Sequence, residues 1–189
     1  MNNETCLYAG AFLHFHEKRL NNSKGKPVHW EMVCRSHDHP TQGIDIIPSL
    51  RDSFILNLER RFPVDSVVIG FPGGICEGTD VVSQGLKELK EETGYTALPN
   101  SHIELSPILN SDPWKSSERG QYISVEVDSS IANPQQNLEE LEEIQPIIVP
   151  KENFLQEIEK IAVQQGCKID SRMYAYALGR FFGKTNKNE

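Results

Sequence analysis

The chain has 189 residues, enough for one domain with a substantial core or for one domain with a small appended sheet. Its formal net charge of −8 at pH 7 argues against nonspecific binding to nucleic acid or acidic membranes, because no basic surplus exists to neutralise phosphates. No apolar run approaches the roughly 20 residues of a membrane helix, the first residues lack a basic signal-peptide start, and four separated cysteines include no Cys-x-x-Cys pair, so we expect a cytoplasmic or nuclear protein with reduced thiols.

The first third of the chain is typical of β-strands joined as hairpins. Its strands are expected, in chain order, at about residues 6–15, 27–35, 43–48, 53–59 and 67–70. The turn-forming stretch 21–25 separates the first two of them. The last is a short buried strand that leads into a glycine-rich stretch.

Pro72, Gly73 and Gly74 predict a tight turn after this strand, because glycine tolerates positive φ and lets a ligand approach the backbone closely. From about Thr79 the pattern becomes helical. The apolar residues expected to face the core stand at i, i+4 and i+7, and they are Val82, Leu86 and Leu89.

The same helix carries three acidic residues on about one turn. Glu88 and Glu92 are four apart and share one face, with Glu91 beside them. Three such carboxylates repel one another unless a cation compensates them, and oxygen ligands suit Mg²⁺. The alternative is a solvated helix face on which Lys87 and Lys90 pair with the acids. The glycines on both sides of the helix favour the metal site.

Beyond this helix the pattern predicts strands, a long loop and two further helices. The strands are expected at about 103–109, 121–127 and 144–149. The acidic stretch 129–143 is expected to be a mobile loop. One helix should run from Glu152 to about Gln164, and a second should follow Asp170 as its N-cap. The second helix should point four side chains inward, namely Met173, Tyr174, Ala177 and Phe181.

This order of elements predicts an α/β fold of the mixed α+β kind, in which helices sandwich a mixed sheet and an extra antiparallel sheet precedes it. Residues 1–45 would form an N-terminal β-hairpin region, residues 46–183 the main domain and residues 184–189 a disordered tail.

The stretch from residue 71 to 95 resembles the Nudix box, G-x5-E-x7-R-E-U-x-E-E-x-G-U, where U is a bulky apolar residue. The second half matches at residues 87–95, with lysine where the family has arginine. The first half is one residue short. Counting forward from Gly74 places Asp80 at the family glutamate, whereas counting back from the lysine places Thr79 there, so this glutamate is absent in either register.

Outside the box, roughly residues 10–182 resemble the ADP-sugar pyrophosphatase branch of the Nudix hydrolases, the ADP-ribose hydrolases. The shared features are a hairpin with a Trp-Glu segment, an arginine–proline segment, a Phe-Pro entry to the box and an Asp-x-Arg-x-Tyr-x-Tyr-Ala-Leu segment. They stand at residues 25–35, 61–63, 71–74 and 170–178. The resemblance implies a Nudix-type α/β/α sandwich, with the N-terminal hairpins serving dimerisation and base binding.

The resemblance also implies catalytic roles for residues of the box and of the loop. Mg²⁺, or Mn²⁺, would be held by Glu88, Glu92 and the backbone carbonyl of Gly73, with Glu91 adjusting the site. Counting back from the end of the last strand places the catalytic base at Glu142. The near alternatives in the same loop are Glu139, Glu140 and Glu143.

Four further residues would bind the nucleoside diphosphate sugar. Trp30 would stack on adenine, worth roughly 1–3 kcal/mol, and Arg35 and Arg61 would meet ribose and pyrophosphate, since arginine grips phosphate bidentately. Phe12 stands where the family often has an aromatic residue supplied by the other subunit of a homodimer. Without the resemblance, Trp30 is equally typical of strand packing, and each arginine is more typical of a surface ion pair.

These features together predict Mg²⁺-dependent hydrolysis of ADP-ribose or a related ADP-sugar to AMP and a sugar phosphate. We expect reduced activity, because the box lacks its first glutamate and Gly70 stands where the branch has another. The alternative is a catalytically inactive Nudix-fold module that binds nucleotides or other proteins.

Overall fold

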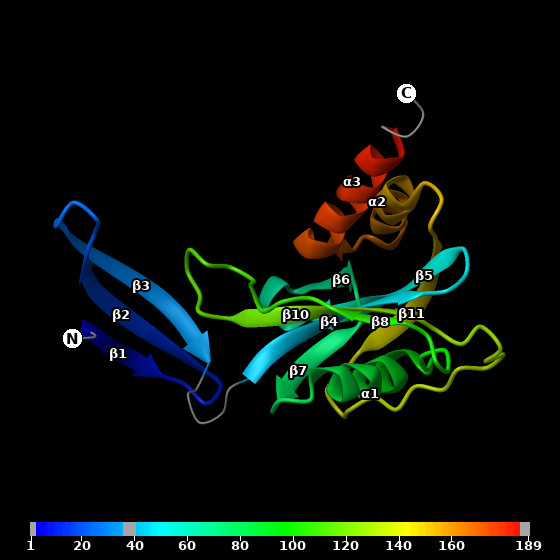
Figure 1. Ribbon diagram of the computed structural model, residues 1–189, viewed down its shortest axis with the longest axis horizontal. Coiled ribbons are helices and arrows are strands. Elements are labelled where there is room, and N and C mark those ends of the chain that lie inside the picture. Colours follow the sequence, from blue (N-terminus) through cyan, green and yellow to red (C-terminus); the bar gives the residue numbers. More distant parts are fainter. Residues whose placement is uncertain (1–2, 36–40, 186–189) are drawn as a thin grey trace.

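The computed structural model describes residues 3–35 and 41–185, which form a small sheet, a large sheet and helices on both faces of the large sheet (Figure 1). The small antiparallel sheet has the strand order β1-β2-β3, with bounds Asn3–Ala9, Leu13–Asn21 and Pro27–Arg35. The single strand predicted at 6–15 is therefore wrong. The chain reverses at residues 10–12, where Gly10 donates its N–H to the Leu13 carbonyl, and a Cβ at Gly10 would lie 2.8 Å from that oxygen.

The large sheet is mixed, since β4 pairs with β10 and β6 with β12 in parallel, while its other pairs are antiparallel. Its first strands are β4 (Thr41–Ser49), β5 (Ser53–Arg61), β6 (Ser66–Gly70) and β7 (Gly73–Glu77). Its later strands are β8 (Ile103–Leu105), β9 (Leu109–Asn110), β10 (Arg119–Glu126), β11 (Ile144–Pro150) and β12 (Lys168–Ile169).

The strand predicted at 103–109 is interrupted after Leu105, where Pro107 has no N–H for a sheet ladder. Because β4 begins at Thr41, the change of sheet precedes the expected boundary at residue 45.

Helices cover both faces of the large sheet, and two hydrophobic clusters fill the space between the layers. The helices are α1 (Val81–Thr93), α2 (Phe154–Gln165) and α3 (Ser171–Thr185). One cluster joins β5, β6 and β11 to α2 and α3, and the other joins β4, β5 and β10 to α1. In Figure 1, α1 accordingly lies on one side of the sheet and α2 and α3 on the other. The predicted sandwich with an extra N-terminal sheet is confirmed.

The buried face of α1 is rotated by one residue from the predicted stripe. Val81, Gly85 and Leu89 are buried, whereas Val82 and Leu86 are only partly buried. A Cβ at Gly85 would lie 2.4 Å from the Ile123 side chain, so the helix packs against the sheet at the position with the smallest residue. Close packing through glycine, rather than the apolar pattern, sets the orientation of α1.

The C-terminal helix follows the prediction at its start and departs from it at its end. The Asp170 carboxylate accepts the N–H groups of Arg172 and Met173, which confirms the N-cap. Phe181 is exposed rather than inward, because the buried face of α3 ends at Ala177 and the last turns extend beyond the sheet. The predicted tail is helical at residues 184–185, and its residues 186–189 lie outside the described part of the chain. None of the described helices has the length and apolar character that crossing a membrane requires.

Candidate active site

The site forms where β7 runs beside α1. Gly73 and Gly74 are paired in β7 with β4, opposite Asp45 and Ile44, and neither has a positive φ. The predicted turn is therefore wrong, because the β4 ladder holds both glycines in a strand. The expected close approach is present: a Cβ at Gly74 would lie 2.7 Å from Cδ of Glu88. The Glu88 carboxylate thus rests directly on the backbone of β7.

Glu92 is buried one turn further along the same face of α1. Its Oε2 accepts the backbone N–H of Gly73 at 2.9 Å and the side-chain amide of Asn57, on β5, at 2.9 Å. Burial raises the pKa of Glu92 to about 8; the Gly73 hydrogen bond opposes the shift, and carboxylates such as Glu59 add to it. Helix, β5 and β7 therefore fix one carboxylate in a place that disfavours its charged form.

Glu88 and Glu91 have different surroundings. Burial raises the pKa of Glu88, with Gln84 opposing the shift and the negative charge of Glu91 adding to it. Glu91 lies toward solvent and its carboxylate is 3.2 Å from Nζ of Lys87, an ion pair of the i,i+4 kind. The pairing with lysine expected as the alternative to a metal site is thus present at Glu91. Glu88 and Glu92 lie instead against β7.

The stretch 129–143 is irregular, and its middle is fastened to the end of α1. Asn137 donates its N–H to the Glu91 carbonyl, and the Gln136 side chain donates to the carbonyl of Glu92. A Cβ at Gly94, which has φ of +76°, would lie 2.4 Å from the backbone nitrogen of Gln135. This loop is therefore positioned against the acidic helix.

Among the four glutamates considered for the base, Glu142 is partly buried and the other three are exposed. Its negative charge is one of those that raise the pKa values of Glu59, Glu88 and Glu92. The structure thus brings Glu142 into the electrostatic field of the buried acids.

The donor chemistry of this cluster fits a hard divalent cation. Glu88, Glu92 and the Gly73 carbonyl offer only oxygen atoms, which Mg²⁺ and Mn²⁺ prefer. The pKa values of Glu88 and Glu92 are raised by burial and by neighbouring negative charge, and such carboxylates gain most from a bound positive charge. Among the described residues, no three carboxylates have oxygens within 4.8 Å of one another, so no site made of three carboxylates is already assembled.

A cleft adjoins the acids at the ends of β5, β6 and α3. Its lining residues are Asn57, Glu59, Arg61, Val68, Gly70, Phe71, Asp170 and Arg172. Arg61 lies 2.7 Å from Glu59, and Arg172 lies 2.9 Å from Asp170 and 2.7 Å from Asp45. Burial raises the pKa of Asp45 to about 6, with Arg172 opposing the shift. The cleft therefore combines carboxylates with two guanidinium groups.

Sequence reasoning missed Glu59, Asn57 and Arg172 as members of this site. The sequence could have predicted Arg172, because it is the arginine of the Asp-x-Arg-x-Tyr segment. Glu59 and Asn57 carry no such signal, since a single polar residue in a strand does not reveal what it faces.

Three predicted substrate-binding residues lie in the small sheet, away from the acids. Trp30 donates its indole N–H to the Trp114 carbonyl at 2.7 Å, and Arg35 is ion-paired with Glu118 at 3.0 Å. Phe12 is 80% exposed at the turn between β1 and β2. Figure 1 shows the small sheet to one side of the large one, joined where β3 pairs with the segment before β10. Within one chain, five of the predicted site residues therefore lie at the acidic site or its cleft, namely Gly73, Glu88, Glu92, Glu142 and Arg61. The other three, Phe12, Trp30 and Arg35, lie at the small sheet.

Comparison with known proteins agrees with this geometry. The chain is 32% identical to the ADP-ribose pyrophosphatase of Saccharomyces cerevisiae over 172 residues, which cover 85% of this chain and 73% of the relative. The chain belongs to the ADP-sugar pyrophosphatase family of Nudix hydrolases. It is also 26% identical over 186 residues to the ADP-sugar pyrophosphatase of Mus musculus, covering 93% of this chain and 84% of that one.

Other comparisons extend the likeness over nearly the whole length of this Nudix chain. A putative nudix hydrolase of Caenorhabditis elegans is 22% identical over 188 residues, covering 94% of this chain and 83% of that protein. A crystal structure of an ADP compounds hydrolase superposes with a TM-score of 0.70 at 17% identity, covering 98% of this chain and 93% of the other, and shows the shared fold. No protein-family model matches the sequence. The predicted family is confirmed, while the roles of individual residues remain predictions.

Proposed function

We propose that this Nudix hydrolase splits the pyrophosphate bond of ADP-ribose or a related ADP-sugar into AMP and a sugar phosphate, with Mg²⁺ or Mn²⁺. The observation that carries the proposal is Glu92, a buried carboxylate held by Gly73 and Asn57 beside Glu88. The names of the yeast and mouse relatives support the substrate class.

In the proposed reaction, some residues bind the metal or the pyrophosphate and one residue accepts a proton. Glu88, Glu92 and the Gly73 carbonyl would hold the metal, which when bound would neutralise charge on the phosphates and favour ionisation of water. Glu142 would take a proton from the attacking water as its oxygen bonds to phosphorus. The bridging P–O bond then breaks, and its electron pair leaves with the departing phosphate. Arg61 and Arg172 would meet the negative charge of the pyrophosphate.

The position of the missing box glutamate favours turnover over the inactive-module alternative. Asp80 is exposed at the start of α1, where its carboxylate accepts the N–H of Ser83. Eight residues separate it from Glu88, which is about 12 Å along the helix axis. The loop deletion therefore removes a carboxylate near the helix start rather than beside Glu88 and Glu92. Contrary to the expectation from the sequence, the short loop should therefore leave the metal site intact.

Gly70 is the departure that bears directly on the cleft. It lines the cleft with Asn57 and Glu59, and a Cβ there would make only an ordinary contact of 3.5 Å with Asp170. The backbone at this position therefore tolerates a side chain, as the branch has there. We propose that Gly70, rather than the short loop, limits metal affinity, so Gly70→Glu should bind Mn²⁺ more tightly than the parent.

The decisive experiment measures AMP release from ADP-ribose with Mg²⁺, with Mn²⁺ and with a chelator. Loss of a general base typically lowers the rate by about 100- to 10,000-fold, so Glu142→Gln should fall in that range, and Glu92→Gln should lose metal-dependent turnover. Glu152→Gln is the matched control, because Glu152 is an exposed glutamate outside the candidate bases of the loop. If the parent binds ADP-ribose but releases no AMP with either metal, the non-catalytic module is the correct function.

The proposal includes a homodimer in which the small sheet of one subunit completes the site of the other. It is supported by the distance of Trp30, Arg35 and Phe12 from the acids of their own chain and by the exposure of Phe12. In this arrangement the small sheet of the partner subunit supplies both aromatic residues: Trp30 would stack on adenine, and Phe12 would close the base site. A cytoplasmic or nuclear location completes the proposal. The absence of a nucleic-acid or membrane partner is supported by the net charge of −8, which leaves no basic surplus to neutralise phosphates.

A further inference from the structure

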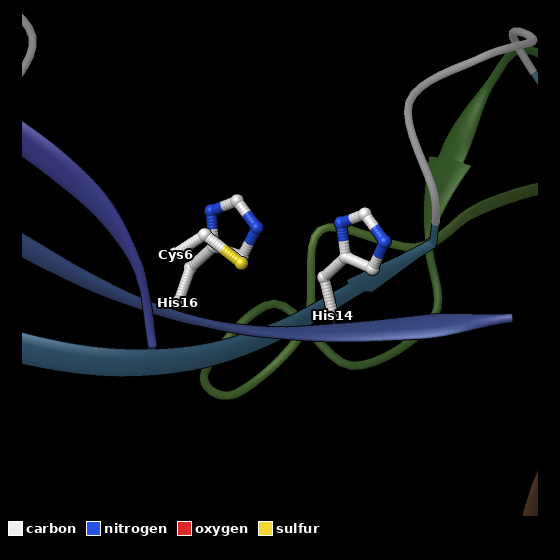
Figure 2. A group of neighbouring side chains, drawn as sticks. All are labelled: Cys6, His14 and His16. Carbon is white, nitrogen blue, oxygen red and sulfur yellow. The ribbon is translucent and has the colours of Figure 1, made fainter. Parts of the chain in front are cut away.

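A second group of metal-binding side chains lies in the small sheet, apart from the acidic site. His14 and His16 are two residues apart on β2, and Cys6 on β1 lies directly opposite His16. Because side chains alternate along a strand and directly paired residues project to the same side, the three share one face of the sheet. Figure 2 shows the three side chains rising together from β1 and β2.

The three side chains are close enough to bind one ion together. Their sulfur and nitrogen ligand atoms all lie within 4.8 Å of one another, and the two imidazole rings are parallel within 8° with centroids 5.9 Å apart. In a tetrahedral zinc site with Zn–S of about 2.3 Å and Zn–N of about 2.0–2.1 Å, ligand atoms are roughly 3.5 Å apart. Small side-chain rotations therefore bring this trio to binding distance.

A carboxylate already orients the central histidine. Nδ1 of His16 is 2.8 Å from Oε1 of Glu4, and His16 is buried. Histidines that bind metal through one nitrogen commonly donate the other N–H to a carboxylate, which fixes the ring and its tautomer. Glu4 holds His16 in this way, so a metal would bind through Nε2.

The small sheet has hydrogen-bonded ladders between its strands but lacks a buried apolar core among its described residues. Of the described side chains in β1–β3, only those of His16 and Cys34 are buried, and neither hydrophobic cluster includes a residue of this sheet. Small units without a sufficient core often depend on a metal or a disulfide. A cross-link between β1 and β2 would contribute stability that burial does not.

We propose that Cys6, His14 and His16 form a structural Zn²⁺ site that fastens the edge strand β1 to β2. Cys6 is exposed, so water would complete the four-coordinate site beside these three ligands. Thiolate and imidazole ligands select Zn²⁺ over Mg²⁺, whereas the oxygen ligands on α1 do the opposite. The two sites would therefore take different metals from the same solution.

A disulfide does not account for the cysteines on this face. Cys6 and Cys34 lie on strands at either side of β2, so two strand spacings place their backbones about 9.5 Å apart. The Cα atoms of a disulfide are at most about 7 Å apart.

The test uses the reduced full chain after metal removal, titrated with Co²⁺ as a coloured substitute for Zn²⁺. We expect one equivalent to give tetrahedral cobalt bands with a thiolate-to-cobalt charge-transfer band, which Zn²⁺ abolishes and excess Mg²⁺ does not. Cys6→Ser should lose the charge-transfer band, and His14→Gln should bind Co²⁺ at least tenfold more weakly. Cys167→Ser and His102→Gln are the matched controls and should behave as the parent.

Thermal unfolding gives a readout that does not depend on cobalt. Zn²⁺ should raise the melting temperature of the parent and of Cys167→Ser but not that of Cys6→Ser, whose exposed side chain makes a folded variant the expected result. Absence of the charge-transfer band in the parent, its survival in Cys6→Ser, or equal loss in Cys167→Ser would each overturn the proposal. Loss on Cys34→Ser with retention in Cys6→Ser would overturn the ligand assignment.

Discussion

At the scale of single residues, the two adjacent glycines of β7 serve different purposes. A Cβ at Gly73 would lie 2.1 Å from the backbone oxygen of Ile44, whereas a Cβ at Gly74 would meet the flexible end of the Glu88 side chain. Displacing the backbone of β4 would cost much free energy, whereas the Glu88 side chain can rotate away. Gly73 is therefore required by the sheet and Gly74 by the position of the Glu88 carboxylate.

Substituting these glycines should separate stability from metal affinity. Gly73→Ala should lose about 1–3 kcal/mol of unfolding free energy through overpacking. Gly74→Ala should lose less but bind Mn²⁺ at least tenfold more weakly, because its methyl group displaces Glu88. Gly179→Ala, in α3 with open space around it, is the control and should stabilise by about 0.5–1 kcal/mol. Urea unfolding and calorimetric titration measure the two effects, and equal Mn²⁺ affinity in Gly74→Ala and the parent would contradict this account.

Glu92 should make the stability of the metal-free protein depend on pH. Its pKa is raised from 4.5 to about 8, so the folded state holds this proton more tightly than the unfolded chain. The contribution of Glu92 is therefore fully present below about pH 4.5 and is lost as pH rises to about 8, at a rate of at most about 1.4 kcal/mol per pH unit.

Unfolding in urea across this pH range, for the parent and Glu92→Gln, checks the expectation. The glutamine oxygen can still accept from Gly73 and Asn57, so the variant should fold and lose part of the pH dependence. Other buried acids such as Asp45 shift in the same direction, so the difference between the two proteins isolates Glu92. Added Mg²⁺ should stabilise the parent more at pH 8 than at pH 5, and identical pH profiles would contradict the role of Glu92.

At the scale of elements, the apolar periods predicted the helices, most strands and the buried residues Met173 and Ala177 of α3, but not how α1 faces the sheet. In α1 the backbone comes very close to the sheet at Gly85, which a hydrophobic pattern counts as neutral. The turn expected at Gly73 and Gly74 follows from glycine's freedom of φ, yet here glycine is needed for space within a strand. The apolar period of a sequence shows which side of an element is apolar. How closely that element packs depends on residues of other elements that are distant in sequence.

For the acidic site, too, the sequence predicted which residues share a face but not how each one packs. The i,i+4 spacing of Glu88 and Glu92 placed both on one face of a helix, and counting within the resemblance placed Glu142 near them. The spacing did not show that Glu92 is buried on Asn57 while Glu91 pairs with Lys87. That difference arises from the packing of α1 on β5 and β7.

The start of α1 offers a test at this scale. The Asp80 carboxylate accepts the Ser83 N–H as an N-cap, so Asp80→Ala should lose about 1 kcal/mol of stability. Asp80→Asn should retain most of it, because asparagine caps equally well. Neither variant should change Mn²⁺ affinity, given the distance to Glu88. A large loss of affinity in both variants would instead assign Asp80 to the metal site.

At the scale of the whole molecule, the small sheet presents an apolar face opposite the histidine face. Tyr8 lies across from Phe15, and Leu13 is two residues from Phe15, so these three side chains share one face. All three are exposed, Tyr8 by 69%, and Phe12 adjoins them at the turn. Contiguous exposed apolar groups of this kind mark protein interfaces. This face is the surface through which we expect the homodimer to form.

Light scattering coupled to gel filtration tests this interface. Tyr8→Ser/Phe15→Ser should shift the parent dimer to monomer, because each substitution removes apolar area from the contact. Leu105→Ser/Ile108→Ser removes two exposed apolar side chains elsewhere and should leave the dimer intact. A monomeric parent, or a control variant that dissociates equally, would contradict the assignment of this face.

If the small sheet acts on the partner's site, inactive subunits should complement one another. Trp30→Ala removes the base contact and Glu92→Gln removes the metal contact, so each homodimer should be impaired. In a mixed dimer of these two variants, a site built from the acids of one subunit and the small sheet of the other gives a simple result. One site carries both substitutions and the other carries neither. Co-expression with two affinity tags and measurement of AMP release should then recover about half the parent activity per dimer. If Trp30 serves the site of its own chain, every site carries one lesion and activity does not recover, so the same measurement separates a shared site from two independent ones.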